Sequence, residues 1–271
     1  MTAFIHHFLF EFRAGLRDRN LLLMNYLFPL GFFALMGVLM TQINPGFKET
    51  MVPAMVIFAF LSSAVLGLPG PLVAAREGGI FRSYRINGVP ALSILVIPAV
   101  STTFHMVLVS AAIAICGPLL FGATMPVNAL GCVLTFLAVA VACTGVGVLI
   151  GVIASDSRAI VLWSQLVFLP SMLLGGLMVP VSLLPATLGR VAWLLPSTQA
   201  MNAFNSLGLR LATGHPPMES IAILLAGGLL AFAAAIYLFK WDSRSDTHRG
   251  HPAMALLVVL PYAAGMILMA R

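Results

Sequence analysis

The chain has 271 residues, of which 61% are hydrophobic and only 8% charged, with a formal net charge of +6 and a mean hydropathy of +1.05. A water-soluble domain averages about 45–50% apolar and about 25% charged residues, so this composition excludes a soluble globular protein and indicates a chain lying mostly in lipid. The basic excess would also suit nucleic-acid binding. In a membrane protein, however, Lys and Arg collect in the cytoplasmic loops, and we predict no nucleic acid as a partner.

The N-terminal arm, residues 2–19, predicts an amphipathic helix ahead of the first long apolar run. Its large apolar side chains recur at helical spacing and its charges fall on the other side: Phe4, Ile5, Phe8, Leu9, Phe12 and Leu16 against Glu11, Arg13, Arg17 and Asp18. This pattern is typical of a helix that lies along a membrane surface. The same residues also fit an extension of the first span, and the order of charges argues against a cleaved signal peptide.

Long apolar runs make up most of the remaining chain. About 20 residues, at about 1.5 Å per residue, cross a hydrocarbon core of about 30 Å. Backbone groups cannot stay unpaired in lipid, so we expect helices and assign an all-α polytopic membrane fold. Six spans are predicted over residues 21–41, 52–74, 91–121, 129–154, 159–179 and 220–239, followed by a further apolar segment over 253–270.

The basic residues predict the orientation. Alternate connections carry ten Lys and Arg residues on one side (Arg13, Arg17, Arg19, Arg76, Arg82, Arg85, Arg158, Lys240, Arg244, Arg249) and four on the other (Lys48, Arg190, Arg210, Arg271). Because cytoplasmic loops hold the excess, the N-terminus is predicted to be cytoplasmic. Two alternatives stay open for the last segment: a seventh span would put the C-terminus outside, and a re-entrant or interfacial segment would return it to the cytoplasm.

Residues 178–211, between the fifth and sixth spans, neither span nor resemble a solvated loop. Pro180, Pro185 and Pro196 divide them into apolar pieces that are too short to cross a bilayer. We expect short helices that dip into the outer leaflet, with a partly buried outer cap as the alternative.

The spans hold few groups for chemistry. None carries Asp, Glu, Lys or Arg at its middle, and His105, the one titratable candidate, is interpreted as a packed structural residue. P-loop, H-E-x-x-H and G-x-S-x-G signatures with a plausible base are absent. The cysteines lack metal-site spacing and are interpreted as buried thiols, with a Cys116–Cys132 disulfide as the alternative. We therefore expect no catalytic residue, no metal ligand and no cofactor in this chain.

The loop over residues 75–90, AREGGIFRSYRINGVP, predicts a short amphipathic helix. Glycines precede the piece IFRSYRI, in which Ile80, Phe81, Tyr84 and Ile86 are apolar and Arg82 and Arg85 are expected to be exposed. Such a piece is typical of a knob that docks into a groove on a soluble partner. Arginines that snorkel toward lipid headgroups would produce the same pattern.

Small residues predict two further features. Gly147 and Gly151 form a G-x-x-x-G, with Gly145 nearby, and such spacing lets helices approach closely in lipid. Gly175 and Gly176 permit either a hinge or loose packing at the end of the fifth span.

Residues 1 to about 240 resemble the membrane subunit of type-2 ABC exporters, a family that includes drug, lipid and polysaccharide efflux systems. The resemblance rests on the amphipathic arm, on REGGIFRSYRINGVP, which is similar to the family's E-x-G-x-hydrophobic-x-R-x-R segment, and on LPSMLLGGLMVPVSLLPATLGRVAWLLPSTQAMNAF after span five. It implies a six-helix transmembrane domain over residues 1–240. Residues 241–271 would then be a cytoplasmic loop plus an extra apolar segment.

The resemblance also implies site residues. The loop would form a coupling helix that docks on a separate ATPase through Arg76, Glu77, Gly79, Phe81, Arg82, Tyr84 and Arg85. Short re-entrant outer helices would close the exit through Pro180, Leu184, Pro185, Trp193, Leu195 and Pro196. The chain departs from the family at Ile80, where many members carry Thr, at Gly88, where many carry Pro, and in its seventh apolar segment.

The partners implied are an ABC ATPase subunit that carries ATP and Mg, a second copy or a related permease chain, and membrane lipid. The expected function is the permease half of an exporter in a bacterial-type cytoplasmic (inner) membrane, moving a hydrophobic or amphipathic drug, lipid or glycan. A secondary transporter or channel would require a mid-membrane ion site that the sequence lacks. An intramembrane enzyme would require paired catalytic groups, and a non-transporting scaffold is the remaining alternative.

Overall fold

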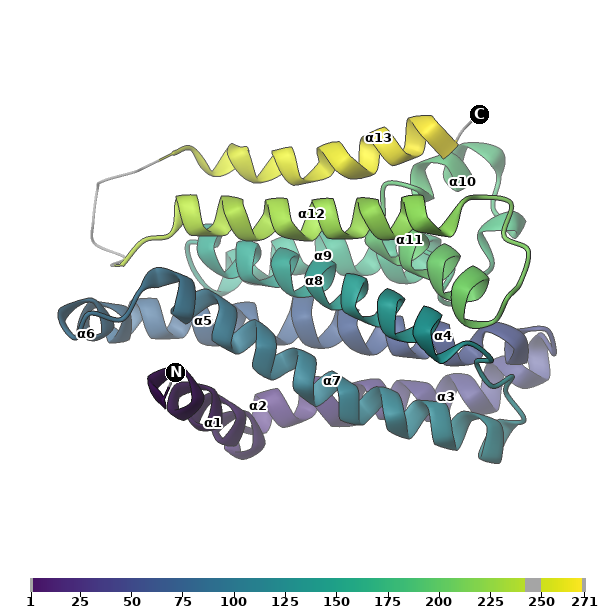
Figure 1. The fold of residues 1–271 in the computed structure, drawn as a ribbon, viewed down its shortest axis with the longest axis horizontal. Helices are drawn as coiled ribbons and strands as arrows, with labels where there is room; N and C mark the ends of the chain where they lie inside the picture. The colour runs from purple at the N-terminus through teal and green to yellow at the C-terminus, as the bar shows by residue number, and fades with distance from the viewer. Residues whose placement is uncertain (1, 242–249, 270–271) are drawn as a thin grey trace.

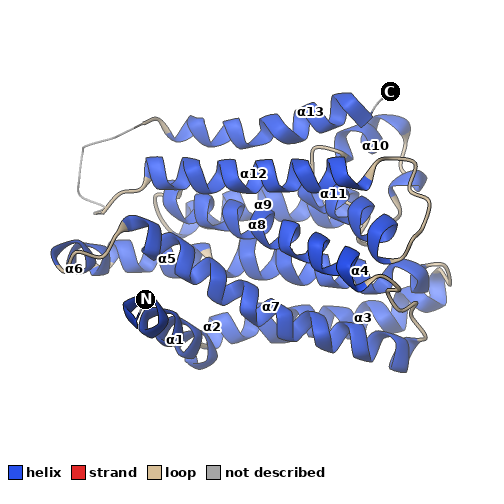
Figure 2. Cartoon of the chain, viewed as in Figure 1, coloured by secondary structure: helices blue, strands red, loops and turns tan. Residues whose placement is uncertain are grey.

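A computed structural model describes residues 2–241 and 250–269, and in these two ranges every regular element is a helix (Figure 2). The long helices lie side by side in one elongated bundle (Figure 1). The short helix α6 (Ile80–Ile86) lies at one end of the bundle and α10 (Ala186–Ala192) lies at the other. We call these the α6 end and the α10 end.

Six helices of the described ranges are long and apolar enough to cross a membrane, which confirms the six predicted spans. The first consists of α2 (Arg19–Leu22), the π-helical η1 (Leu23–Leu27) and α3 (Phe28–Ile43). The second consists of α4 (Phe47–Leu61), the π-helical η2 (Ser62–Gly67) and α5 (Pro69–Glu77). The others are α7 (Ala91–Phe121), α8 (Ala129–Ile153), α9 (Ser157–Leu174) and α12 (Pro217–Leu238).

The fifth span is shorter than predicted. Its helix ends at Leu174 rather than at residue 179, because Gly175 caps it and Gly176 takes a left-handed conformation with φ 81°. A Cβ at Gly175 would also collide with the Ser197 side chain. The glycine pair therefore ends the helix at a tightly packed position, which argues against loose packing.

The second span forms the centre of the bundle and α8 lies beside it, whereas α9 and α3 keep broad apolar faces exposed. The glycines of α8 make this packing close, as their spacing predicted. A Cβ at Gly145 would lie 2.6 Å from the carbonyl oxygen of Gly228 on α12, and a Cβ at Gly147 would collide with the carbonyl of Ala64 in η2. Small residues thus let two backbones approach α8 directly.

The N-terminal helix α1 (Thr2–Arg17) lies beside the first half of α7, near the α6 end (Figure 1). Phe12 stacks on the His105 ring with the centroids 4.5 Å apart, and the Tyr26 hydroxyl lies 2.6 Å from His105 Nδ1. His105 is therefore a packed and hydrogen-bonded residue, as predicted. The side chains of Phe4 and Ile5 fall outside the described ones, as do residues Arg244, Arg249 and Arg271.

The last apolar segment folds back along α12 (Figure 1). It begins as a 3₁₀ helix, η5 (Pro252–Val258), and continues as α13 (Val259–Met269). The Tyr262 ring is buried against Gly227 of α12, where a Cβ would lie 2.5 Å from it. At about 2.0 Å per 3₁₀ residue and about 1.5 Å per α residue, the two pieces reach about 30 Å, the thickness of a hydrocarbon core.

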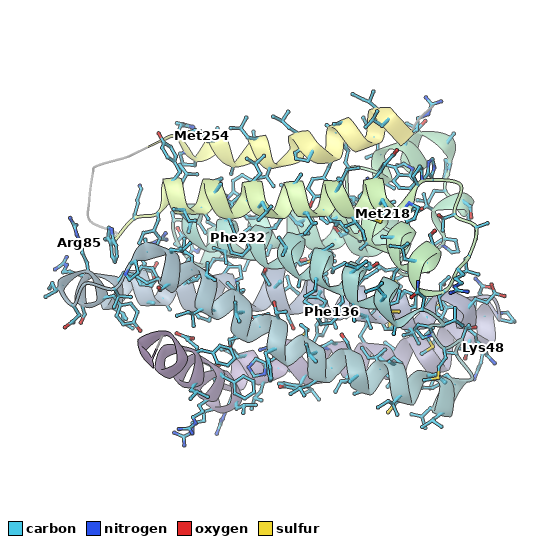
Figure 3. All side chains as sticks on the ribbon, viewed as in Figure 1. Lys48, Arg85, Phe136, Met218, Phe232 and Met254 are labelled. Atoms are coloured by element: carbon cyan, nitrogen blue, oxygen red, sulfur yellow. The ribbon has the colours of Figure 1, made fainter. Side chains whose placement is uncertain are left out.

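We therefore expect this segment to cross the membrane completely. In a variant without native cysteines, Arg271→Cys should react with a membrane-impermeant maleimide from the side opposite to that from which Arg85→Cys reacts. Lys48→Cys, at the α10 end, is the control and should react from the same side as Arg271→Cys (Figure 3). Labelling of Arg271→Cys from the side of Arg85→Cys would favour an interfacial or re-entrant segment instead.

Candidate functional site: an exposed basic helix and a buried polar helix

The predicted short helix of the loop forms α6, with the bounds expected from IFRSYRI. Gly79 adopts φ 74° and Gly88 adopts φ 72°, so each turn that flanks α6 has a glycine in the left-handed region. These turns direct α6 away from α5 and then back into α7.

The outward side of α6 is apolar and basic. Ile86 is 80% exposed, Ile80 is also exposed, and Arg85 extends from the α6 end of the bundle (Figure 3). Phe81, by contrast, is only 4% exposed, and its ring lies 5.4 Å from Phe239 at the end of α12. In this conformation Phe81 anchors α6 to the bundle, and its contact with an ATPase stays a prediction.

Arg76 also lies inside the chain rather than on its surface. It is 7% exposed, and its guanidinium donates to the carbonyl oxygens of Val152 at 2.9 Å, of Ala154, and of Ser155 at 3.4 Å. These carbonyls lie at the C-terminal end of α8, where the last carbonyl groups have no N–H partner within the helix and the helix dipole favours a cation. Arg76 thus joins α5 to α8, and of its two predicted neighbours Glu77 is exposed and Gly79 is partly buried.

Helix α1 has an electrostatic contact with α6, and α9 begins next to Ser155, which Arg76 contacts. Burial raises the pKa of the half-buried Tyr84, and the Glu11 carboxylate of α1 raises it further. Asp156 begins α9 by accepting the backbone N–H groups of Ala159 and Arg158, each at 2.9 Å, and these bonds lower the pKa of its carboxyl. The Glu11 contact and the Arg76–Ser155 contact therefore place α1 and the start of α9 near α6.

At the α10 end, short helices fill the predicted broken stretch. After α9 come the 3₁₀ turn η3 (Val181–Leu183), α10, α11 (Pro196–Ala203) and the π-helical η4 (Phe204–Gly208). All eight residues of α11, PSTQAMNA, are buried although half of them are polar. Ser197 donates to the Ser171 carbonyl at 3.0 Å, and Asn202 donates to the Ser220 hydroxyl at 2.9 Å. A polar helix thus lies inside an apolar bundle.

The predicted gate residues fall into two groups. Pro180, Leu184 and Pro185 surround the surface turn η3, whereas Trp193, Leu195 and Pro196 lead into buried α11. One cavity of about 270 Å³ touches both groups, through Pro180 and Trp193. Polar side chains that sequence reasoning did not single out also line this cavity: Thr50, Ser182, Thr198, Asn202, Asn205 and Thr213. The sequence feature that could have identified Ser182, Thr198, Asn202 and Asn205 is the presence of amide and hydroxyl side chains within the otherwise apolar residues 178–211.

The structure shows no metal centre in residues 2–241 and 250–269, because no three His, Cys, Asp or Glu side chains gather there. Cys116, Cys132 and Cys143 are all free thiols; Cys143 is buried and the other two are partly exposed. The Cys116–Cys132 disulfide is therefore not formed in this structure.

The bundle thus has a short basic helix at one end and a buried polar helix at the other. The family model described as ABC-2 type transporter matches residues 3–208. The chain belongs to the ABC-2 type transporter family. No curated protein and no solved structure matches the chain significantly.

Membership has direct consequences. The chain is a membrane permease without an ATPase site, and ABC-2 permeases pair with ABC ATPase subunits. The matched range includes α1, α6 and α11, and it ends with η4. The helices α12 and α13 lie beyond it.

Proposed function

We propose that the chain is the permease subunit of an ATP-driven exporter that moves a hydrophobic or amphipathic drug, lipid or glycan out across a bacterial-type cytoplasmic membrane. Its partners would be an ABC ATPase, which carries ATP and Mg, and a second permease copy or a related permease chain. The N-terminus and the α6 end would face the cytoplasm, with the α10 end outside.

The outward face of α6 is the observation that carries this proposal. An exposed apolar residue, Ile86, stands beside the exposed Arg85, while Phe81 and Arg76 fix the same segment to α12 and α8. Apolar anchors framed by charge are typical of docking surfaces. A helix that is firmly attached on one side and exposed on the other suits the transmission of a partner's movement.

The distribution of charge supports the orientation. Arg82, Arg85 and Arg158 are exposed at the α6 end, whereas Lys48 lies at the α10 end (Figure 3). Lys and Arg collect on the cytoplasmic side of membrane proteins. The absence of charged side chains from the middle of the spans supports an energy source outside the chain, since ion-coupled transporters hold such groups at that depth.

Exposed apolar faces support a second permease chain. The first span presents Leu35, Leu39 and Ile43, and α9 presents Leu162, Leu166 and Leu173. Both faces flank the central second span, to which Phe28 and Phe168 attach through Phe58. We expect the substrate path between two permease chains, along the first, second and fifth spans.

The test is co-purification with the candidate ATPase. The double variant Arg85→Glu/Ile86→Glu reverses the charge and removes the apolar surface without touching the buried Phe81. We expect it to insert normally and to lose ATPase binding by at least about tenfold, the effect of removing one docking anchor. Met125→Glu is the matched control, because Met125 is an exposed apolar residue at the α10 end and should not affect binding.

Two outcomes would contradict the proposal. Wild-type protein that binds no ATPase would favour a secondary transporter, a channel or a scaffold. Equal binding by wild type and the double variant would mean that the ATPase docks elsewhere than on α6.

A further inference from the structure

Of the three π-helical segments in the described residues, two lie side by side in the membrane part of the bundle. One, η1, interrupts the first span, and the other, η2, interrupts the second span in direct contact with it. π-helical turns are rare and occur frequently at functional sites. Because η1 and η2 contact each other, the two neighbouring spans depart from α-helical geometry at the same depth.

A proline follows each π-helical segment. Pro29 lies two residues after η1 and Pro69 lies two residues after η2. Proline has no backbone N–H, so it leaves a carbonyl of the preceding turn without a helical donor. In lipid, where no water replaces that donor, an unpaired carbonyl is costly.

Serine hydroxyls from neighbouring helices bond carbonyls of these two turns. Ser63 of η2 donates to the carbonyl oxygen of Met24 in η1 at 3.1 Å. Ser164 of α9 donates to the carbonyl oxygen of Val65 in η2 at 2.7 Å. The two bonds form a chain that joins the first, second and fifth spans at one level, and we call these four residues the hydroxyl belt.

Asn25, the residue after Met24 of the hydroxyl belt, has a buried side-chain oxygen that accepts no hydrogen bond. Its side chain is 3% exposed, its Oδ1 has no hydrogen-bond partner, and a Cβ at Gly67 of η2 would lie 3.7 Å from that oxygen. A buried amide oxygen without a donor is unfavourable. A conformation of the helices that brings a hydrogen-bond donor to Asn25 Oδ1 is therefore stabilised relative to the conformation in this structure.

The parts on either side of the hydroxyl belt are firmly packed. Toward the α10 end, Phe28, Phe58 and Phe168 of the same three spans form an aromatic cluster, with ring centroids 5.5–6.4 Å apart. Toward the α6 end, Arg76 and Phe81 fix α5 and α6. Bending is therefore easiest at the hydroxyl belt, because prolines and π-turns are the sites at which helices kink.

We infer that Ser63 and Ser164 are positioning residues of a hinge, at which the α6-end parts of the first and second spans bend together against their α10-end parts, while Ser164 keeps the fifth span bonded to η2. This inference rests on the proposed function, since a bound ATPase supplies the movement at α6. A hydroxyl rotates freely between acceptors, so a serine at this level exchanges one acceptor for another, without losing its hydrogen bond, while the helices bend. Asn25 Oδ1 supplies an alternative acceptor that favours the second arrangement.

The experiment uses the permease bound to its ATPase in lipid nanodiscs, with the native cysteines replaced. One spin-label pair at the α6 end (Asn20→Cys with Asn87→Cys) and one at the α10 end (Gln42→Cys with Glu219→Cys) report how far each end moves when ATP is added. In otherwise wild-type protein we expect ATP to change both distances. ATPase binding is measured on the same samples.

The hydroxyl belt is then altered by Ser63→Ala/Ser164→Ala. We expect normal ATPase binding and an unchanged shift at the α6 end, while the population that shifts at the α10 end falls about tenfold, the factor for losing two interhelical hydrogen bonds in lipid. Ser63→Thr/Ser164→Thr, which keeps both hydroxyls, should restore that shift. Ser110→Ala is the matched control, because the Ser110 hydroxyl is buried without a partner in α7.

The outcomes separate the two proposals. Wild-type protein that binds no ATPase would overturn the proposed function, and the hinge with it. Wild-type binding and movement together with an unaltered α10-end shift in the alanine variant would overturn the hinge alone. Equal loss at both ends, or failure of the threonine variant to restore the shift, would assign the serines a purely structural role and overturn the hinge as well.

Discussion

Replacing Gly147 with alanine is expected to destabilise the protein by about 3 kcal/mol, although it adds a single methyl group. The new Cβ would collide with the Ala64 carbonyl of η2, and backbone at that position cannot move aside without displacing the central span. The midpoint of thermal unfolding in detergent, followed by loss of monodisperse protein, measures the effect.

Gly31→Ala is the matched control for this substitution. Gly31 also lies in a membrane span, but a Cβ there would meet no atom within 4 Å. Because alanine has the higher helix propensity, this variant should be as stable as wild type or slightly more so. Equal stability of Gly147→Ala and Gly31→Ala would show that α8 does not approach η2 as closely as described.

Replacing Arg76 with methionine is expected to lower the free energy of unfolding by about 3 kcal/mol. The substitution keeps the length of the side chain but removes the donors that serve the carbonyl groups of Val152, Ala154 and Ser155 at the end of α8. Hydrogen bonds to a charged group contribute about 1.5–3 kcal/mol, and buried carbonyls left unpaired add to the loss. Thermal unfolding measures it.

The control separates this buried role from docking. Arg85→Met removes a charge from the exposed side of α6 and should leave thermal stability unchanged while it weakens ATPase binding. Arg76→Met should do the opposite: we expect a large loss of thermal stability and a smaller effect on ATPase binding. A stable Arg76→Met variant with impaired binding would instead return Arg76 to the ATPase surface, as the family resemblance implied.

The membrane spans could be predicted because a hydrocarbon core imposes one length and one composition on any helix that crosses it. The third span has the predicted bounds, residues 91–121, since Pro90 and Gly122 end the apolar run on both sides. The fifth was predicted to be too long, because the residues after Leu174 remain apolar although the backbone turns at Gly175 and Gly176. Hydropathy does not register such a turn.

The candidate site was only partly predictable. The bounds of α6 follow from its flanking glycines, which act locally. Which side of α6 faces the bundle depends on where α12 and α8 end, and these are far away in sequence. The resemblance implied that Phe81 and Arg76 contact an ATPase, which stays a prediction, and the structure shows both side chains buried against the bundle.

Composition, the length of the apolar runs and the spacing of glycines and arginines therefore determined by themselves that this chain is a helical membrane bundle with six long spans, a further apolar segment and a basic helix at one end. Only the tertiary structure decided the rest: the burial of polar α11, the return of α13 along α12, and the serine bonds of the hydroxyl belt. The physical reason is the distance along the chain over which these interactions act. Hydrophobicity and turn geometry act within a few residues, whereas the partner of a buried carbonyl is set by helices that meet only after folding.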